Sequence, residues 1–323
     1  MRIKYLCLLF ISFFIIACPA EPTYFDDPFL INLEIKKGQD LTQKYEDLVS
    51  DVELHFGTQE IEKLRQYKII LVPGFLSDVV IDLGNMGPMQ VTRLGQYFDD
   101  QMHWLEENEI DYERVAIESE ASPEFNATII ATSIQKSEKP VLLITHSKGG
   151  IDSLEALLRN DDLAKKVKGW IPIQAPFFGS PVADWVIERS NLSTLAFHLL
   201  EQLGGTEESL QSLKTDIRIE YLKQNKEKII NLIKTIKIIS FTSWKEDEGW
   251  DWDTLLEPTR DCMSKKGLRS DGLVPANYAI LPNTDFIQIS KTDHAVPVMH
   301  CMLAQFDRIS FTKAILVLLL EKL

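Results

Sequence analysis

The sequence that decides the fold is Val141-Leu142-Leu143-Ile144-Thr145-His146-Ser147-Lys148-Gly149-Gly150. It begins with an apolar, strand-forming run that is typical of a buried strand. The run ends at a serine that lies between a histidine and a pair of glycines. A serine becomes an exposed nucleophile when a sharp strand-to-helix turn lifts its Oγ above the sheet, and such a turn admits only small neighbours. The pattern therefore predicts a reactive side chain at Ser147.

The flanking residues fit this turn with one departure. Gly149 occupies the second glycine position of the motif G-x-S-x-G, whereas Thr145 replaces the first glycine. A small residue at that position is the minimum that the turn needs. A helix is expected at residues 151–159, because Ile151, Leu154 and Leu157 recur at helical spacing. The strand and the helix together favour a site over an ordinary loop.

Length and charge limit the kind of protein. A chain of 323 residues suits one large domain with insertions. The formal net charge of −14 argues against nucleic acid as a partner and against electrostatic docking on anionic lipid. Neither idea is supported by a cluster of Lys and Arg. We find no internal repeat and no low-complexity segment.

The N-terminus is predicted to be a targeting signal. Arg2 and Lys4 precede an apolar run over residues 5–17, which is too short to span a bilayer comfortably. The run ends at Cys18 in a sequence that resembles the lipobox of bacterial lipoproteins, whose cysteine is lipidated and becomes the mature N-terminus. The expectation is export to a bacterial cell envelope with a lipid anchor on a membrane surface. The alternatives are an ordinary signal peptide, with a periplasmic or secreted product, or an uncleaved anchor. Cleavage before Cys18 takes the net charge from −14 to −16.

After loss of the signal and lipidation of Cys18, the remaining cysteines are Cys262 and Cys301. In an oxidising compartment they either pair or stay as two buried thiols. They flank the segment that holds the other catalytic candidates.

Strands and helices alternate along the rest of the chain. This order predicts an α/β fold with a mainly parallel sheet and helices on both faces. We expect a signal at residues 1–18, a tether and N-terminal helical extension at 19–66, and one domain at 67–323 with a cap or lid at about 190–235. Strands are predicted at 68–72, 114–117, 141–144, 167–173, 236–241 and 286–289, and helices at 41–66, 91–107, 123–135, 151–159 and 299–322.

A reactive serine needs a base and an acid. In enzymes built on this turn, the acid and then the histidine follow the serine, each on a loop after a later strand. Asp271 lies in a turn-forming sequence after the strand predicted at 236–241, and His294 follows the strand at 286–289 within five residues. We therefore expect Asp271 and His294 to serve Ser147.

Other candidates fit less well. His146 abuts the serine, and a turn points adjacent side chains apart, so it is expected to pack and fix the turn; Asp293 is set aside as the acid on similar grounds. His300 is a reserve base, and His198 lies in the expected lid. The acidic residues between Glu246 and Asp253 are interpreted as a solvated loop, with a calcium site as the alternative. No cofactor is expected.

Four separated motifs resemble those of bacterial lipases and esterases of the α/β-hydrolase family. The resemblance covers residues 68–301 and implies that family's fold, with a helical lid or cap insertion. Pro73, Thr145, Lys148 and Phe177 depart from the usual residues of the family. The motifs are Leu71-Val72-Pro73-Gly74-Phe75, the segment from Thr145 to Gly150, the segment from Gln174 to Asp184, and Asp271-Gly272-Leu273-Val274.

The resemblance implies hydrolysis of lipid-like carboxylic esters through a serine ester on Ser147. Backbone N–H groups of Phe75 and Lys148 would then form the oxyanion hole. A lid would favour lipid-like acyl chains, and its apolar face would come from residues 195–203; the alternative is a permanent cap. Thioester hydrolysis, deacylation of a lipid-linked glycan and polyester cleavage follow as alternatives. A different class, a non-catalytic envelope lipoprotein on a hydrolase scaffold, also stays open. The sequence does not indicate an oligomeric state.

Overall fold

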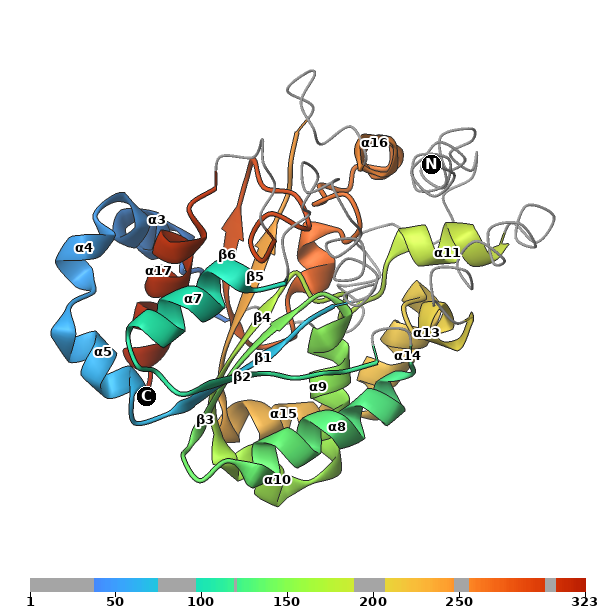
Figure 1. The fold of residues 1–323 in the computed structure, drawn as a ribbon. Helices are drawn as coiled ribbons and strands as arrows, with labels where there is room; N and C mark the ends of the chain where they lie inside the picture. Colours follow the sequence, from blue (N-terminus) through green and yellow to red (C-terminus); the bar gives the residue numbers. More distant parts are fainter. Residues whose placement is uncertain (1–37, 75–96, 119–120, 189–206, 247–255, 300–305) are drawn as a thin grey trace, which may run out of the picture.

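The computed structural model describes residues 38–74, 97–118, 121–188, 207–246, 256–299 and 306–323. Within them, a six-stranded sheet has the strand order β2-β1-β3-β4-β5-β6, and each neighbouring pair is parallel. Helices cover both faces of the sheet (Figure 1). The strands are β1 (Lys68–Val72), β2 (Tyr112–Arg114), β3 (Val141–His146), β4 (Val167–Ile173), β5 (Lys237–Ser243) and β6 (Asp285–Ile289).

The central strands are apolar on both sides because the sheet divides two hydrophobic cores. Successive side chains of a strand point to opposite faces. On β3, Leu142 and Ile144 accordingly pack into one core and Val141 and Leu143 into the other. This explains why the sequence shows continuous apolar runs instead of an alternating pattern.

The first core is covered by the last helix of the chain, α17 (Arg308–Leu320), together with α7 (Asp99–Glu107). Helix α17 is buried over most of its circumference, which its apolar sequence requires. The prediction of a helix over 299–322 is wrong at its start. Asp307 accepts hydrogen bonds from the backbone N–H groups of Ile309 and Ser310, and this N-cap begins the helix at Arg308.

The charged stretch predicted as one helix over 41–66 forms three helices, α3 (Thr42–Ser50), α4 (Val52–His55) and α5 (Thr58–Leu64). Gly57 separates the last two in an extended conformation. All three contact α17, and Lys44–Glu321 and Glu53–Lys313 ion pairs join α3 and α4 to it. The breaks between the three helices let residues 42–64 change direction and keep contact with α17.

The second core is covered by α8 (Pro123–Lys136), α9 (Lys148–Arg159), α10 (Asp161–Lys166) and α15 (Lys226–Thr235), which lie on the opposite side of the sheet from α17 (Figure 1). Ile229 and Leu232 of α15 are buried in this core. The expected cap over 190–235 is therefore corrected at its C-terminal end. Helix α15 belongs to the layer that covers the sheet, because its apolar face is needed there.

The short edge strand also differs from the prediction. A strand was expected at 114–117, whereas β2 pairs with β1 over Tyr112–Arg114. Val115 and Ile117 are buried in the second core beyond the end of the strand. Their alternating pattern reflects this packing, which period-two spacing alone does not distinguish from strand pairing.

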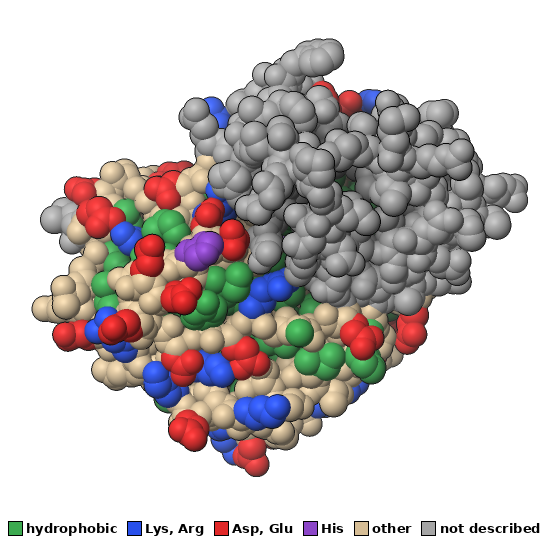
Figure 2. Space-filling view, viewed as in Figure 1, with side chains coloured by type: hydrophobic (Ala, Val, Ile, Leu, Met, Phe, Trp, Pro, Cys, Tyr) green, Lys and Arg blue, Asp and Glu red, His purple; other side chains and the backbone are tan. Residues whose placement is uncertain are grey.

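The remaining described helices lie near the carboxyl ends of the strands: α11 (Pro181–Glu188), α13 (Glu207–Gln211), α14 (Thr215–Gln224) and α16 (Glu257–Ser264), with a 3-10 turn at Ala276–Ala279. Asp184 fixes the start of α14, since its carboxylate accepts hydrogen bonds from the backbone N–H and hydroxyl of Thr215. In the view of Figure 2, Lys and Arg side chains of the described surface are interspersed with Asp and Glu.

Several predictions concern residues outside those described. These are the signal and Cys18, the start of the helix at 91–107, and the apolar lid segment at 195–203. Cys301 also lies there, so its pairing with Cys262 of α16 stays a prediction. None of the described helices has the length and apolar character needed to cross a membrane.

Candidate active site

Ser147 occupies the predicted turn between β3 and α9. Its backbone has φ 52° and ψ −130°, a conformation that a non-glycine residue adopts only under constraint from its surroundings. Gly149 and Gly150 contribute to that constraint, because without side chains they let neighbouring loops pack closely against the start of α9. A Cβ on Gly149 would lie 2.2 Å from the carbonyl oxygen of Pro73, and one on Gly150 would lie 2.3 Å from Cβ of Ala175. The two glycines thus let α9 begin directly against β1 and β4.

The loop after β1 runs next to the serine. A Cβ added to Gly74 would lie 2.8 Å from Cβ of Ser147, so only glycine fits between them. Phe75, one predicted oxyanion donor, lies outside the described residues. Lys148, the other, is the first residue of α9, and N–H groups of a first helical turn have no partner within the helix. Its backbone N–H therefore has no hydrogen-bond partner within α9, and its role as an oxyanion donor stays a prediction.

Asp271 and His294, chosen from the sequence, are in contact. Nδ1 of His294 lies 2.8 Å from Oδ2 of Asp271, and the backbone N–H of His294 donates to the carbonyl oxygen of Asp271. The other carboxylate oxygen accepts hydrogen bonds from the backbone N–H groups of Leu273 and Val274. Because Oδ2 of Asp271 accepts a hydrogen bond from the ring, the contact selects the histidine tautomer with its proton on Nδ1. In this tautomer Nε2 carries a lone pair and can accept a proton.

His146 lies beneath this pair. Its ring centroid is 4.7 Å from that of His294, and its Nε2 is 2.8 Å from the backbone carbonyl oxygen of His294. Burial, assisted by the charge of His294, lowers the pKa of His146 well below its usual value. His146 is therefore neutral and structural, as the sequence suggested. Because it adjoins Ser147, its contact brings the serine turn and the histidine loop together.

Asp293 also has a structural part in the histidine loop. Its Oδ1 accepts hydrogen bonds from the backbone N–H groups of Ala295 and Val296. This turn directs the chain after His294 toward α7, where Gln101 donates to the carbonyl oxygen of Pro297. The carboxylate that contacts the imidazole is that of Asp271.

A second buried ion pair lies in the first turns of α9. Nζ of Lys148 is 3.0 Å from both carboxylate oxygens of Asp152, and both side chains are fully buried. Asn126 of α8 donates to the same carboxylate at 2.8 Å. Burial raises the pKa of Asp152 to about 6, against the opposing effects of Lys148, Asn126 and Arg218. The Lys148 side chain thus points into the protein, and only its backbone is available to a substrate.

Sequence reasoning assigned no individual role to Asp152 or to two other polar residues near the site. Gln174 and Ser243 follow or end the buried strands β4 and β5, and both are fully buried. A polar residue that ends an apolar strand was the available signal, since such residues meet at the carboxyl edge of a parallel sheet. Thr145 is explained as well: its Oγ1 accepts a hydrogen bond from the indole N–H of Trp170, which a glycine could not do.

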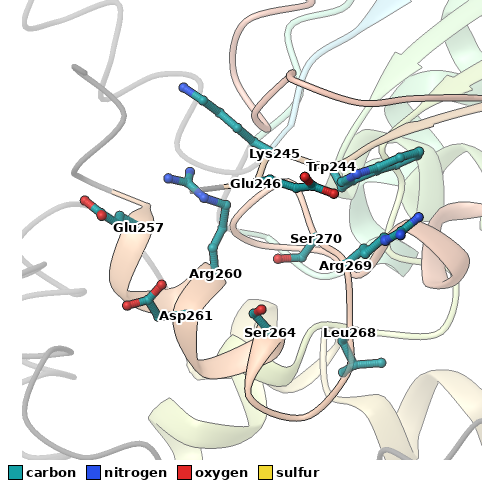
Figure 3. Close-up of a pocket in the computed structure, with 10 residues that line it drawn as sticks. All are labelled: Trp244, Lys245, Glu246, Glu257, Arg260, Asp261, Ser264, Leu268, Arg269 and Ser270. Carbon is teal, nitrogen blue, oxygen red and sulfur yellow. The ribbon is translucent and has the colours of Figure 1, made fainter. Parts of the chain in front are cut away.

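A cavity of about 230 Å³ adjoins the acid loop (Figure 3). Ser270, the residue before Asp271, lines it together with Trp244, whose ring lies 5.3 Å from the guanidinium of Arg269. Six of the ten lining residues are charged. The others are Lys245, Glu246, Glu257, Arg260, Asp261, Ser264 and Leu268.

The remaining candidates lie wholly or partly outside the described residues. His198, His300 and most of the acidic stretch from Glu246 to Asp253 are among them. Among the described residues, no group of three His, Cys, Asp or Glu side chains is arranged to hold a metal ion. The calcium alternative stays a prediction.

The fold is that of the α/β hydrolases, as the sequence predicted. The structure is similar to that of a metagenomic carboxyl esterase, with 23% identity and a TM-score of 0.63 over 80% of this chain and 77% of that one. It is also similar to a lipase from Bacillus licheniformis in its mature form, with 21% identity and a TM-score of 0.56 over 72% of this chain and 86% of that one.

Sequence comparison adds one local match. Residues 117–202 match the model of the lecithin:cholesterol acyltransferase family, a span that includes Ser147 and Gln174 but ends before Asp271 and His294. No match to the sequence is found among curated proteins. The resemblance to lipases and esterases noted in the sequence is thus confirmed for the fold.

Proposed function

We propose that the protein is a serine hydrolase that cleaves carboxylic esters through an acyl-enzyme on Ser147. The observation that carries this proposal is the 2.8 Å contact between Asp271 and His294 beside a serine held at positive φ. A carboxylate, an imidazole and a serine in this order are the parts of an acyl-transfer triad. The names of the similar proteins, a carboxyl esterase, a lipase and an acyltransferase family, support ester chemistry.

Each group has a defined step in this mechanism. Oγ of Ser147 attacks the ester carbonyl while Nε2 of His294 takes its proton; the tetrahedral intermediate collapses, and the alcohol leaves with that proton. Water then attacks the acyl-enzyme, His294 takes a proton from it, and the acid leaves as the proton returns to Ser147. Asp271 holds Nδ1 and stabilises the imidazolium. Backbone N–H groups of Phe75 and Lys148 would bind the oxyanion, each contributing about 3 kcal/mol in the transition state.

The substrate class that we propose is lipid-like esters. The similar lipase and the lecithin:cholesterol acyltransferase model favour it. Thioesters and acyl groups on lipid-linked glycans are the alternatives. We further propose export and lipidation at Cys18, on the lipobox resemblance alone. Mass spectrometry of the N-terminal peptide tests this, and an unmodified Cys18 would contradict it.

The test of the activity is turnover of p-nitrophenyl esters of increasing chain length by the full chain in detergent, with fluorophosphonate labelling. Ser147→Ala should abolish both. Ser153→Ala is the matched control and should keep both. Ser153 is a buried serine of α9, the helix that follows Ser147, and its hydroxyl has no partner among the described residues. A matched thioester series separates the two substrate classes. Folded protein that neither turns over nor labels would favour a binding scaffold.

A further inference from the structure

Three consecutive carbonyl groups of the histidine loop are each held by a side chain from a different strand end. The three donors come from the ends of β5, β4 and β3, which are neighbours in the sheet. The bonds are Ser243 Oγ to the carbonyl oxygen of Thr292 at 2.9 Å, Gln174 Nε2 to that of Asp293 at 2.8 Å, and His146 Nε2 to that of His294 at 2.8 Å. We call these three side chains the strand-end clamp.

Gln174 is the centre of the clamp, and its amide is fully used. Nε2 donates to the Asp293 carbonyl and also to Oγ of Ser243 at 2.5 Å, while Oε1 lies 3.2 Å from Nε2 of His146. The opposite orientation of the amide would place its NH₂ against the His146 donor and its oxygen against a carbonyl. The network therefore defines one orientation, with every amide group bonded.

The backbone of Gln174 is also constrained. Its φ is +50°, and its N–H donates to the carbonyl oxygen of Phe241 on β5 at 2.7 Å. A glutamine held in the left-handed region costs on the order of a kcal/mol, and such strain persists only where the surroundings enforce it. The turn at the end of β4 thus directs this side chain across the strand ends.

The hydrogen-bond partner of His146 determines which of its ring nitrogens carries the proton. A carbonyl oxygen can only accept, so Nε2 of His146 carries the hydrogen and the ring is the neutral Nε2–H tautomer. Burial lowers the pKa of this ring, which keeps it neutral. A neutral donor holds the His294 carbonyl without adding a positive charge next to an imidazole that must itself become positive.

All three clamp side chains are fully buried. Water cannot replace a lost donor there, so each removal leaves a carbonyl unsatisfied and frees the loop to move toward another partner. Among the described residues, the other hydrogen bonds of His294 are to one residue, Asp271, through the backbone N–H and the ring. The clamp holds the loop from the side of the sheet, and Asp271 holds it from the side of the acid loop.

We propose that the strand-end clamp of His146, Gln174 and Ser243 positions His294 for catalysis by fixing the carbonyl groups of residues 292–294 on the sheet. The inference rests on the proposed function, in which His294 is the base. The clamp residues are positioning residues that touch no reacting atom. A displacement of about 1 Å in a catalytic group can cost on the order of a hundredfold in rate.

The test compares Gln174→Met, Ser243→Ala and a matched control in the full chain. Gln174→Met keeps the length of the side chain and removes its three side-chain hydrogen bonds, to Asp293, Ser243 and His146. Ser240→Ala is the control, because Ser240 is a fully buried serine of the same strand whose hydroxyl bonds Thr284 and the N–H of Leu281, away from the histidine loop. For each variant, kcat, KM, thermal unfolding and hydrogen–deuterium exchange of the peptide spanning residues 291–298 are measured.

We expect Gln174→Met to lower kcat by about 30-fold and Ser243→Ala by about fivefold, with KM within about twofold of the wild type. Exchange should rise in the 291–298 peptide of both variants. Ser240→Ala should leave kcat and this exchange unchanged even where it lowers thermal stability. If Gln174→Met does not fold, Ser243→Ala against Ser240→Ala decides alone.

The clamp is overturned if Ser243→Ala matches Ser240→Ala in both kcat and exchange. A wild type that neither turns over esters nor labels at Ser147 overturns the proposed function instead. In that case the exchange measurement still decides whether the clamp orders the loop, because it does not depend on turnover.

Discussion

Two buried acid–base pairs lie beside Ser147, and they differ in what each acid can do. Asp271 contacts an imidazole whose second nitrogen remains available, and two backbone N–H groups hold its other oxygen. Asp152 contacts the ammonium of Lys148, one turn away on the same helix, and an amide of α8. The first pair joins two loops at the carboxyl edge of the sheet. The second pair lies within the first turns of α9, on its buried side.

The difference shows that a buried charge next to a nucleophile is not by itself evidence of catalysis. In the proposed mechanism the Asp271 pair can pass a proton, because Asp271 contacts Nδ1 of His294 and leaves Nε2 for the serine proton. The ammonium of Lys148 is instead fully buried against both carboxylate oxygens of Asp152. We infer that the Asp152 pair fixes the first turns of α9, which begins at Lys148, the proposed oxyanion donor.

The largest effect should come from Asp271→Asn. The variant keeps the shape of the side chain but donates to Nδ1, which forces the wrong tautomer of His294, and kcat should fall by about 10⁴. Steady-state kinetics with a p-nitrophenyl ester and urea unfolding of the same sample measure the two consequences. Stability should change far less than activity. Retention of activity within about tenfold would remove Asp271 from the triad.

Breaking the second pair should act on stability instead. Lys148→Met leaves a buried carboxylate without its cation, which costs about 3–5 kcal/mol of unfolding free energy. The double variant Lys148→Met with Asp152→Leu should recover most of that loss, because neither charge remains. Urea unfolding measures both. Lys165→Met, which breaks the exposed pair with Asp162, is the control and should show no measurable change. A double variant no better than the single one would contradict this account.

The pH dependence of stability should also distinguish the pairs. Burial raises the pKa of Asp152 to about 6, above the value of about 4 in an unfolded chain. The folded state then binds this proton more tightly, so the stabilising contribution is complete below about pH 4 and is lost as the pH rises through about 6. The unfolding free energy of wild type relative to Asp152→Asn should therefore increase from pH 7 to pH 5. A constant difference would contradict the shift.

The smallest effect should come from Asp293→Asn, the same chemical change next to the base. Asparagine keeps the oxygen that accepts from Ala295 and Val296, so activity should stay within about twofold of the wild type. Asp293→Ala should cost about 1 kcal/mol in stability through loss of that turn. Kinetics and urea unfolding again provide the measurements. A fall in kcat comparable to that of Asp271→Asn would make Asp293 the acid.

Much of the fold follows from the sequence, because the buried strands are marked by length and composition. β1 and β4 have the predicted bounds, and Ser147 lies between a strand and a helix as its glycines indicated. The contact between Asp271 and His294 was predictable because parallel strands bring the loops at their carboxyl ends to one edge. The order serine, acid, histidine along the chain then selected Asp271 and His294 from the other acids and histidines.

The errors arose where different structures give the same apolar sequence pattern, because the pattern shows that a residue is buried but not which element buries it. Val115 and Ile117 are buried without being in a strand, and α15 lies on the sheet although its sequence suited a cap. The start of α17 is set by the N-cap residue Asp307, which the apolar pattern did not mark. The strand-end clamp was not predicted, since a glutamine and a serine at strand ends have many ordinary uses and only the register of three strands brings them to one loop.

Helix α17 has a consequence for the order in which the two cores can form. It covers one face of the sheet and contacts α3, α4 and α5, which lie far from it in the sequence. Contacts between segments so distant in the chain form slowly, because a long loop must close before they are made. Until α17 docks, the side chains of β3 that face it lack the cover that this helix gives. We therefore expect this core to close later in folding than the core on the opposite face, where α8, α9 and α10 lie close to β3 in the sequence.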